Sequence, residues 1–75
     1  MKLNPVPSSC LKAAGYDYET ETLYVQFTSG KTYEYYNVPK NVYDEMMTAL
    51  SRGNYLATKI ANAYNYSEIR EDKGN

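Results

Sequence analysis

Lys31-Thr-Tyr-Glu-Tyr-Tyr-Asn-Val-Pro39 is the stretch of sequence that decides the fold. It has tyrosine at three of four consecutive positions and stops at Val38-Pro39. The alternating run Leu23-Tyr-Val-Gln-Phe27 precedes it, and Thr28-Ser-Gly30 joins the two. Alternation of apolar and polar residues is typical of a strand with one buried face. The two runs therefore predict an antiparallel hairpin.

The length of the turn fixes how these two strands pair. A two-residue loop would leave the tyrosines of the second strand facing solvent. With a three-residue loop, Val25 faces Tyr33. Leu23 then faces Tyr35, and Gly30 takes the left-handed position of a type I turn followed by a bulge. We predict the three-residue loop, because a slip of one residue would expose the whole apolar set.

Two short helices are predicted after the hairpin. Pro39 suits the first position of a helix, where its missing N–H costs no hydrogen bond. Gly53 is predicted to cap the end of the first helix, and Asn54 to cap the start of the second. The apolar stripe of the first helix consists of Val42, Met46, Ala49 and Leu50, widened by Tyr43 and Met47. The second helix is predicted to bury Leu56, Ile60 and Tyr64.

The ends of the chain complete the predicted fold. Residues 1–7 are expected to form an extended lead-in, because proline disfavours a helix before it. A first strand is expected over residues 8–16, with Gly15 marking a bulge. Residues 67–75 are expected to be a polar C-terminal tail. Residues 8–66 then form one α+β domain, a three-stranded antiparallel β-meander followed by a helical hairpin packed on one face.

Composition limits the classes of function. The chain has 75 residues, ten Tyr, one Phe, one Cys, no His and a net charge of −1. A single cysteine excludes an internal disulfide, and with no histidine it does not make a metal site, so no cofactor is expected. The charge balance disfavours a large phosphate-binding surface. The sequence has no apolar run of membrane-spanning length and no signal peptide, so we expect a cytoplasmic protein. A domain this small gains from oligomerisation, and we expect a homo-oligomer.

An ordered series of residues runs through about residues 6–66: Ser8-Ser9, Leu11, Gly15-Tyr16-Asp17, Leu23, Val25, Phe27, Gly30, Tyr33-x-Tyr35, Val38-Pro39, Tyr43, Ser51-x-Gly53, Tyr55 and Ile60. This series resembles the KTSC domain. That family is named for the C-terminus of some lysyl-tRNA synthetases and also occurs as stand-alone bacterial or phage proteins. The resemblance implies RNA binding. The family's asparagine after the aromatic pair is replaced here by Ala57, and basic residues near the last tyrosines are largely missing. This departure weakens the implication.

The tyrosines of the hairpin are the first candidate site residues. By the predicted register, Tyr33 and Tyr35 lie over the sheet and under the helices. We expect them to pack in the core, with hydroxyls that reach its edge and line a ligand pocket. Tyr24 and Tyr36 lie on the other face, which no predicted helix covers. Exposed aromatic rings there form either an oligomer interface or a stacking platform, and we favour the interface.

The corner between the helices is the second candidate site. Ser51 to Asn54 lead into a helix N-terminus, whose free N–H groups favour an anion. Arg52 with Asn54 and Lys59 is a candidate for holding one phosphate or carboxylate. The alternative is a plain turn between helices with solvated charges. No residue pattern indicates a catalytic site, and Cys10 is expected to be a small buried side chain.

Three functions remain open at this stage. The preferred one is a non-catalytic module that binds or sequesters a small nucleotide-type ligand, as a phage counter-defence protein would. In it a tyrosine stacks on the base and Arg52 contacts the phosphate. The second is RNA binding, which demands a strong salt dependence. The third is a protein-interaction or inhibitor domain that docks through a tyrosine-rich surface.

Overall fold

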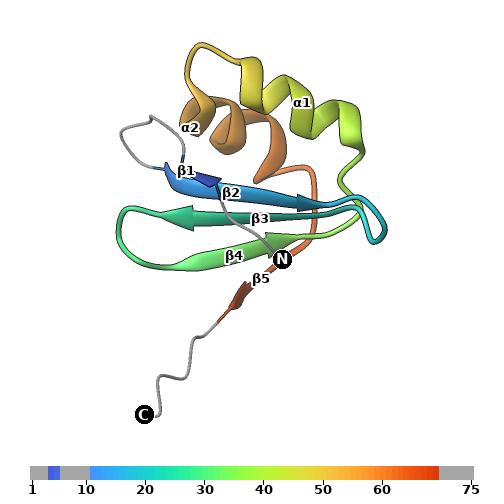
Figure 1. Ribbon diagram of the computed structural model, residues 1–75, viewed down its shortest axis with the longest axis horizontal. Coiled ribbons are helices and arrows are strands. Elements are labelled where there is room, and N and C mark those ends of the chain that lie inside the picture. The colour runs from blue at the N-terminus through green and yellow to red at the C-terminus, as the bar shows by residue number, and fades with distance from the viewer. Residues whose placement is uncertain (1–3, 6–10, 70–75) are drawn as a thin grey trace.

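The computed structural model describes residues 4–5 and 11–69, and these form one antiparallel sheet with a helical layer on one side (Figure 1). The sheet is five-stranded, in the order β1-β2-β3-β4-β5. Along the chain, the elements are β1 (Asn4–Pro5), β2 (Leu11–Asp17), β3 (Thr22–Phe27), β4 (Thr32–Tyr35), α1 (Lys40–Thr48), α2 (Arg52–Tyr55), the π-helical stretch η1 (Leu56–Ile60) and β5 (Tyr66–Ile69). None of these helices is long and apolar enough to cross a membrane.

The predicted meander is confirmed as β2, β3 and β4, with the predicted register. Leu23 pairs with Tyr35, and Val25 pairs with Tyr33. The turn closes through two backbone hydrogen bonds, from Gly30 N–H to Phe27 O at 2.9 Å and from Phe27 N–H to Lys31 O at 2.8 Å. Gly30 has a φ of +99°, a conformation that side-chain-bearing residues rarely adopt. The glycine therefore sits where the three-residue loop requires it.

The sheet is wider than the predicted meander because both ends of the chain add a strand. In β1, Asn4 pairs with Ala14, so this part of the extended lead-in is bonded to the sheet. On the other edge β5 pairs antiparallel with β4, with Tyr66 opposite Tyr35. The prediction that the polar tail starts at residue 67 is wrong for residues 67–69. The backbone of β4 supplies hydrogen bonds to this segment whatever its side chains are.

Other sequence predictions for the ends lie outside the described residues. They concern the remainder of the lead-in, the start of the first strand at residues 8–10 with Cys10, and the tail at residues 70–75. The predicted bulge in the first strand is displaced. Gly15 pairs regularly with Tyr24, and the register shifts between Leu11 and Ala13 instead.

The boundaries of the helices differ from the prediction at the inter-helix corner. Pro39 lies just before α1 rather than inside it, and α1 ends at Thr48. The Thr48 hydroxyl donates to Asp44 O at 3.1 Å, inside the helix, and the chain becomes extended at Ala49. Leu50, predicted to belong to the apolar stripe, is therefore fully exposed. Helix α2 then begins and runs directly into η1, where Ala61 N–H donates to Leu56 O, five residues back, at 2.8 Å.

The capping residues at this corner also differ. Gly53 does not cap α1, because it lies inside α2 and is buried. Asn54 is not the N-cap of the second helix either. That role belongs to Ser51, whose side chain accepts a hydrogen bond from the backbone N–H of Asn54 at 3.2 Å.

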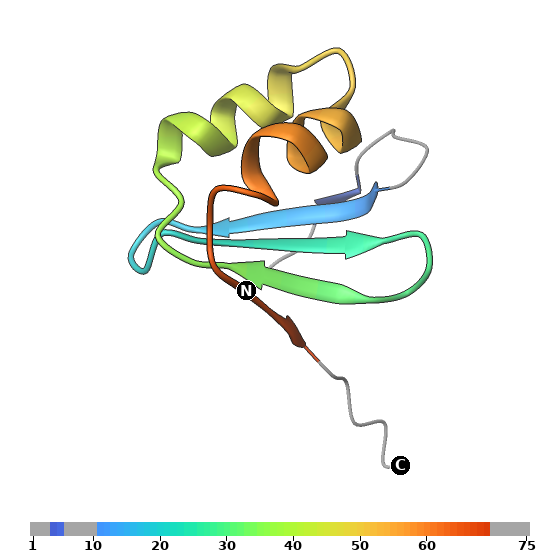
Figure 2. The same cartoon turned by 180° about the vertical axis from the view of Figure 1, so that it is seen from behind.

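The core lies between the sheet and the helical layer. Its members share near-complete burial: Leu11, Ala14, Leu23, Val25, Tyr35, Val38, Met46, Leu56 and Ile60. The predicted burial of Leu56 and Ile60 is confirmed, and Tyr64 packs against the core while half-buried. Figures 1 and 2, seen from opposite sides, both place β5 at the end of the sheet farthest from the helices. The aromatic side chains near β5 are therefore the ones that the helical layer leaves open.

Candidate functional site

Four aromatic side chains form a row on the helix-facing side of the sheet, across β3, β4 and β5. They are Phe27, Tyr33, Tyr35 and Tyr66, called the aromatic row below. They share a face because side chains alternate along a strand and because Tyr35 pairs with both Leu23 and Tyr66. The row follows directly from the register of β4 with its two neighbours.

The rings of the aromatic row contact one another closely. Tyr33 and Tyr66 are stacked, with ring centroids 5.4 Å apart and planes 9° apart. Phe27 meets Tyr33 edge-on at 5.5 Å, and Tyr66 lies 5.4 Å from Tyr35. Both geometries are favoured for aromatic pairs. The rings therefore hold one another in place and form a continuous apolar surface.

The row passes from the core to solvent. Tyr35 is buried, and burial is the main reason that its pKa is raised. Phe27 and Tyr33 are half-buried, and Tyr66 is 53% exposed. The prediction that Tyr33 and Tyr35 pack together over the sheet is thus met fully by Tyr35 and partly by Tyr33. The side of the Tyr33 ring that the core leaves open stacks on Tyr66. The sequence did not indicate Tyr66 as a site residue, because Tyr66 lies in a polar segment.

Two charged residues lie beside the row. Lys31 is opposite Phe27 at the turn and is exposed. Glu68 is opposite Tyr33 in β5 and is also exposed. The open part of the row therefore has a cation near one end and a carboxylate beside its centre.

The inter-helix corner uses its polar groups to end and start helices. The Arg52 side chain is half-buried, and its Nε donates to Met47 O at 2.8 Å, satisfying a carbonyl at the end of α1. Ser51 caps α2 as described above, while Asn54 and Lys59 are exposed. Figures 1 and 2 place the loop before α2 at the opposite end of the molecule from β5. The structure does not bring this corner together with the open tyrosines.

The predicted interface residues lie on the far face of the sheet. Tyr24 pairs with Glu34, and the Tyr36 hydroxyl donates to the Glu34 carboxylate at 3.0 Å. Burial, with the charges of Glu34 and Asp17 as smaller causes, raises the pKa of Tyr24. Both rings are half-buried. That they form an oligomer interface stays a prediction.

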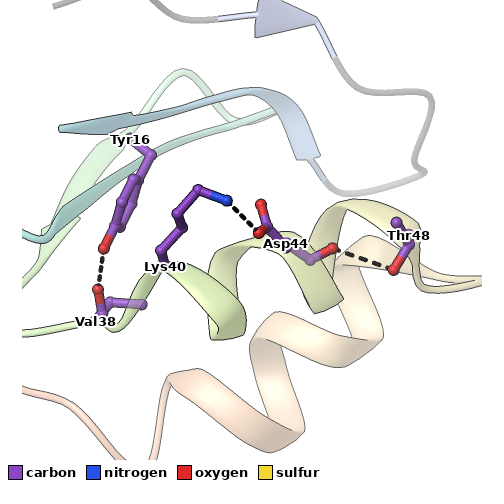
Figure 3. A network of polar contacts seen from close by, with 5 residues as sticks. All are labelled: Tyr16, Val38, Lys40, Asp44 and Thr48. Carbon is purple, nitrogen blue, oxygen red and sulfur yellow. Dashed lines mark hydrogen bonds and ion pairs between the residues drawn. The ribbon is translucent and has the colours of Figure 1, made fainter. Parts of the chain in front are cut away.

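A second tyrosine cluster, which sequence reasoning missed, fixes the loop before α1 to the sheet. The Tyr16 hydroxyl of β2 donates to Val38 O, as Figure 3 shows. The Tyr16 ring stacks on Tyr43 of α1 at 4.9 Å and meets Tyr18 edge-on at 5.0 Å. Tyr16 and Tyr43 are distant in sequence, so no local pattern could reveal the contact. The cluster is a structural clamp between sheet and helix.

An ion pair borders this clamp. Lys40 Nζ lies 2.7 Å from Asp44 Oδ2, one turn along α1 (Figure 3). The hydrogen bond to Asp44 and its charge raise the pKa of Lys40. The ammonium is also 5.9 Å from the ring centroid of Tyr18, which is 60% exposed. Because its charge is already paired, Lys40 is a weak candidate for binding an anion.

The tyrosines make stability sensitive to alkaline pH. Burial raises the pKa of Tyr35 and Tyr43, and the hydrogen bond to Glu45 raises the pKa of Tyr55 to about 12. In the unfolded chain these groups ionise near pH 10. Below about pH 10 these tyrosines are protonated in both the folded and the unfolded chain, and their contribution to the free energy of unfolding is complete. Between about pH 10 and the folded-state pKa values, the unfolded chain loses protons that the folded chain retains, so stability falls.

Thermal melts at increasing pH check this expectation. The melting temperature should decline steeply above about pH 10, and Tyr55→Phe should make the decline shallower. A melting temperature that stays constant through this range would contradict the assigned environments of the tyrosines.

Most of the chain is similar in sequence to known proteins. The KTSC domain matches residues 7–64. A protein from Tsukamurella paurometabola is 44% identical over 54 residues, which are 72% of this chain and 81% of that protein. A lysine–tRNA ligase from Nostoc sp. is 38% identical over 61 residues, 81% of this chain, although the match spans only 11% of the ligase.

A solved structure agrees in fold. The crystal structure of a KTSC domain protein from Yersinia pestis superposes with a TM-score of 0.86 at 31% identity, covering 92% of this chain and 97% of that one. The family match extends over most of the chain and includes the hairpin, the clamp tyrosines and the inter-helix corner. The chain therefore belongs to the KTSC domain family.

Proposed function

We propose that this domain is a non-catalytic binding module that holds a nucleotide-type ligand by stacking its base on the open part of the aromatic row. The observation that carries the proposal is the stacked pair Tyr33–Tyr66, which continues to Phe27 and opens to solvent at Tyr66. A flat apolar surface built from rings suits another flat ring. Nucleobases are the common planar ligands, and stacking on an aromatic side chain contributes about 1–3 kcal/mol per base.

The charges near the row favour a small ligand over a long nucleic acid. In this proposal Lys31, opposite Phe27 at the turn, contacts the phosphate of a small ligand, whereas Glu68 beside Tyr33 repels a polyanion. The net charge of −1 points the same way. Arg52, the phosphate contact expected from sequence, is bonded to the end of α1 and has no part in this site. A module of this design would sequester its ligand rather than convert it.

RNA is the second candidate, because the matching lysine–tRNA ligases are by name proteins that act on a tRNA. A single strand would use the same rings and would add phosphate contacts. The two candidates differ in their response to salt. A mononucleotide contributes few phosphate contacts, whereas affinity for a strand falls steeply as salt rises.

Titration followed by the NMR signals of the aromatic rings tests the proposal. The probes are adenosine monophosphate and single-stranded oligoadenylate, each at low and high salt. Tyr66→Ala should weaken binding by about 5- to 150-fold, as expected from the loss of about 1–3 kcal/mol of stacking. Tyr66→Phe should retain most of the affinity because it keeps the ring.

Tyr18→Ala is the matched control, since Tyr18 is 60% exposed and lies outside the aromatic row. It should bind as the unmodified protein does. The proposal fails if neither probe shifts the Tyr33 and Tyr66 signals. It also fails if Tyr18→Ala weakens binding as much as Tyr66→Ala, since binding would then not depend on the row. In the first case, a protein partner for the tyrosine surfaces becomes the function to test.

A further inference from the structure

The two edges of the sheet are built differently. At one edge, β1 is two residues long and ends in Pro5, which cannot donate a backbone hydrogen bond. At the other edge, β5 has no proline, lysine or bulge over Tyr66–Ile69, and no strand of the described residues pairs with its outer side. Proline, lysine and bulges are among the devices that prevent an edge from pairing with another chain. The β5 edge lacks these three, and its protection is limited to its short length and to the charge of Glu68.

The hydrogen bonds of β4 show which backbone groups of β5 point outward. Tyr36 N–H donates to Asn65 O at 2.9 Å, so these two residues form a hydrogen-bonded pair. Such pairs alternate along an antiparallel ladder, and Ser67 is therefore bonded to β4 opposite Glu34. The N–H and C=O groups of the alternate residues, Tyr66 and Glu68, point away from the sheet. They are available to a further strand.

We infer that the β5 edge pairs with the β5 edge of a second copy of this chain, around a two-fold axis through Ser67. In this register Tyr66 of each copy is opposite Glu68 of the other, and each such pair exchanges both of its backbone hydrogen bonds. The outward groups of the edge thus satisfy one another. A closed two-fold interface of this kind is self-complementary. The inference does not depend on the proposed ligand.

The side chains favour this register and favour a second copy of the chain as the partner. This register places Tyr66 of each copy opposite Glu68 of the other on the same face, and tyrosine–glutamate hydrogen bonds already form twice within the chain, at 3.0 Å for Tyr36–Glu34 and 2.6 Å for Tyr55–Glu45. A shift that centred the axis on Glu68 would place two carboxylates opposite each other, which is unfavourable. On the other face only two small Ser67 side chains meet.

The arrangement also leaves room for the second copy. Figures 1 and 2 place the helical layer at the end of the sheet away from β5, so a paired copy meets no helix there. A two-fold axis perpendicular to the sheet keeps like faces together. The aromatic rows of the two copies would then lie on one continuous face and meet at Tyr66.

Sedimentation velocity over a wide range of protein concentration tests the inference. The unmodified protein should show a reversible dimer. Ser67→Lys places two lysines opposite each other across the axis, while within each copy the lysine lies beside Glu34, so the monomer is not harmed. The dimer dissociation constant should rise at least about tenfold. Asn62→Lys adds the same charge at an exposed turn and should leave the dissociation constant unchanged.

A second variant removes a backbone donor instead of adding charge. Glu68→Pro deletes an N–H that points away from β4, so the monomer should keep its circular dichroism spectrum and the dimer should weaken. Amide hydrogen exchange at Tyr66 and Glu68 should slow as the unmodified protein is concentrated. A chain that stays monomeric at every concentration overturns the inference. A dimer that Ser67→Lys does not weaken overturns it as well, since that dimer forms through another surface.

Discussion

Replacing Tyr35 with alanine is expected to lower the free energy of unfolding by about 3–5 kcal/mol. Tyr35 is only 3% exposed and occupies the centre of the sheet's buried face, opposite Leu23. Its removal loses the burial of a large ring and leaves a cavity that a sheet–helix core closes poorly. The free energy of unfolding of a domain is about 5–15 kcal/mol in total, so this single change removes a large share of it. Urea unfolding followed by circular dichroism measures the loss.

The conservative variant Tyr35→Phe separates the ring from its hydroxyl. Among the described residues the Tyr35 hydroxyl has no hydrogen-bond partner, so its removal should change the free energy of unfolding by less than about 1 kcal/mol. A loss with phenylalanine as large as with alanine would show that the hydroxyl, not the packing of the ring, stabilises the fold. Because Tyr35 also contacts Tyr66, the alanine variant should disturb the aromatic row and the phenylalanine variant should preserve it.

Ile60→Ala is the second substitution with a large expected effect, about 2–5 kcal/mol of destabilisation. Ile60 is completely buried at the end of η1, in the same core cluster as Tyr35 and Leu56. Together with Met46 and Leu56, Ile60 forms the buried part of the helical layer that packs on the sheet. Loss of Ile60 should therefore lower the denaturant midpoint of the whole domain rather than loosen one helix.

Lys59→Ala is the matched control for this substitution. Lys59 precedes Ile60 in the same helical stretch but is exposed, and its replacement should change stability by no more than about 0.5 kcal/mol. Equal effects of Lys59→Ala and Ile60→Ala on the urea midpoint would contradict the assignment of Ile60 to the core. A smaller effect of Ile60→Ala confined to the helical circular dichroism signal would indicate that the helical layer unfolds separately.

Five of the ten tyrosines have distinct roles in the fold. Tyr16 and Tyr43 clamp the helical layer to the sheet, and Tyr35 fills the core. Tyr33 and Tyr66 extend the core outward as an open surface. The proposed function rests on this last pair, because its rings are stacked and Tyr66 is open to solvent.

Much of the fold could be predicted because it depends on local patterns. The alternation of Leu23, Val25 and Phe27 identifies a strand, and the position of Gly30 selects one register from two. The helical spacing of Leu56 and Ile60 identifies the buried face of the second helix. In each case neighbouring residues carry the physical signal, either as a periodic apolar face or as a backbone angle that suits glycine.

The errors occurred where side chains compete for the backbone carbonyls at the end of a helix. The apolar spacing extends the first helix to Leu50, but Thr48 and Arg52 bond to carbonyls near its end and the chain turns earlier. Arg52 was expected to be free for a phosphate, and its role in ending α1 depends on how the two helices meet. A sequence pattern records which groups can bond, not which partner is near.

The sequence by itself determined the α+β class, the three-stranded meander with its register, and most of the apolar core, because periodic burial and turn chemistry are local properties. Only the tertiary structure decided that residues 66–69 form the edge strand β5 and that Tyr66 stacks on Tyr33. A polar edge strand has no alternation of apolar and polar residues from which it could be predicted. It is held by hydrogen bonds to the exposed backbone of β4, and these exist only once the meander has folded.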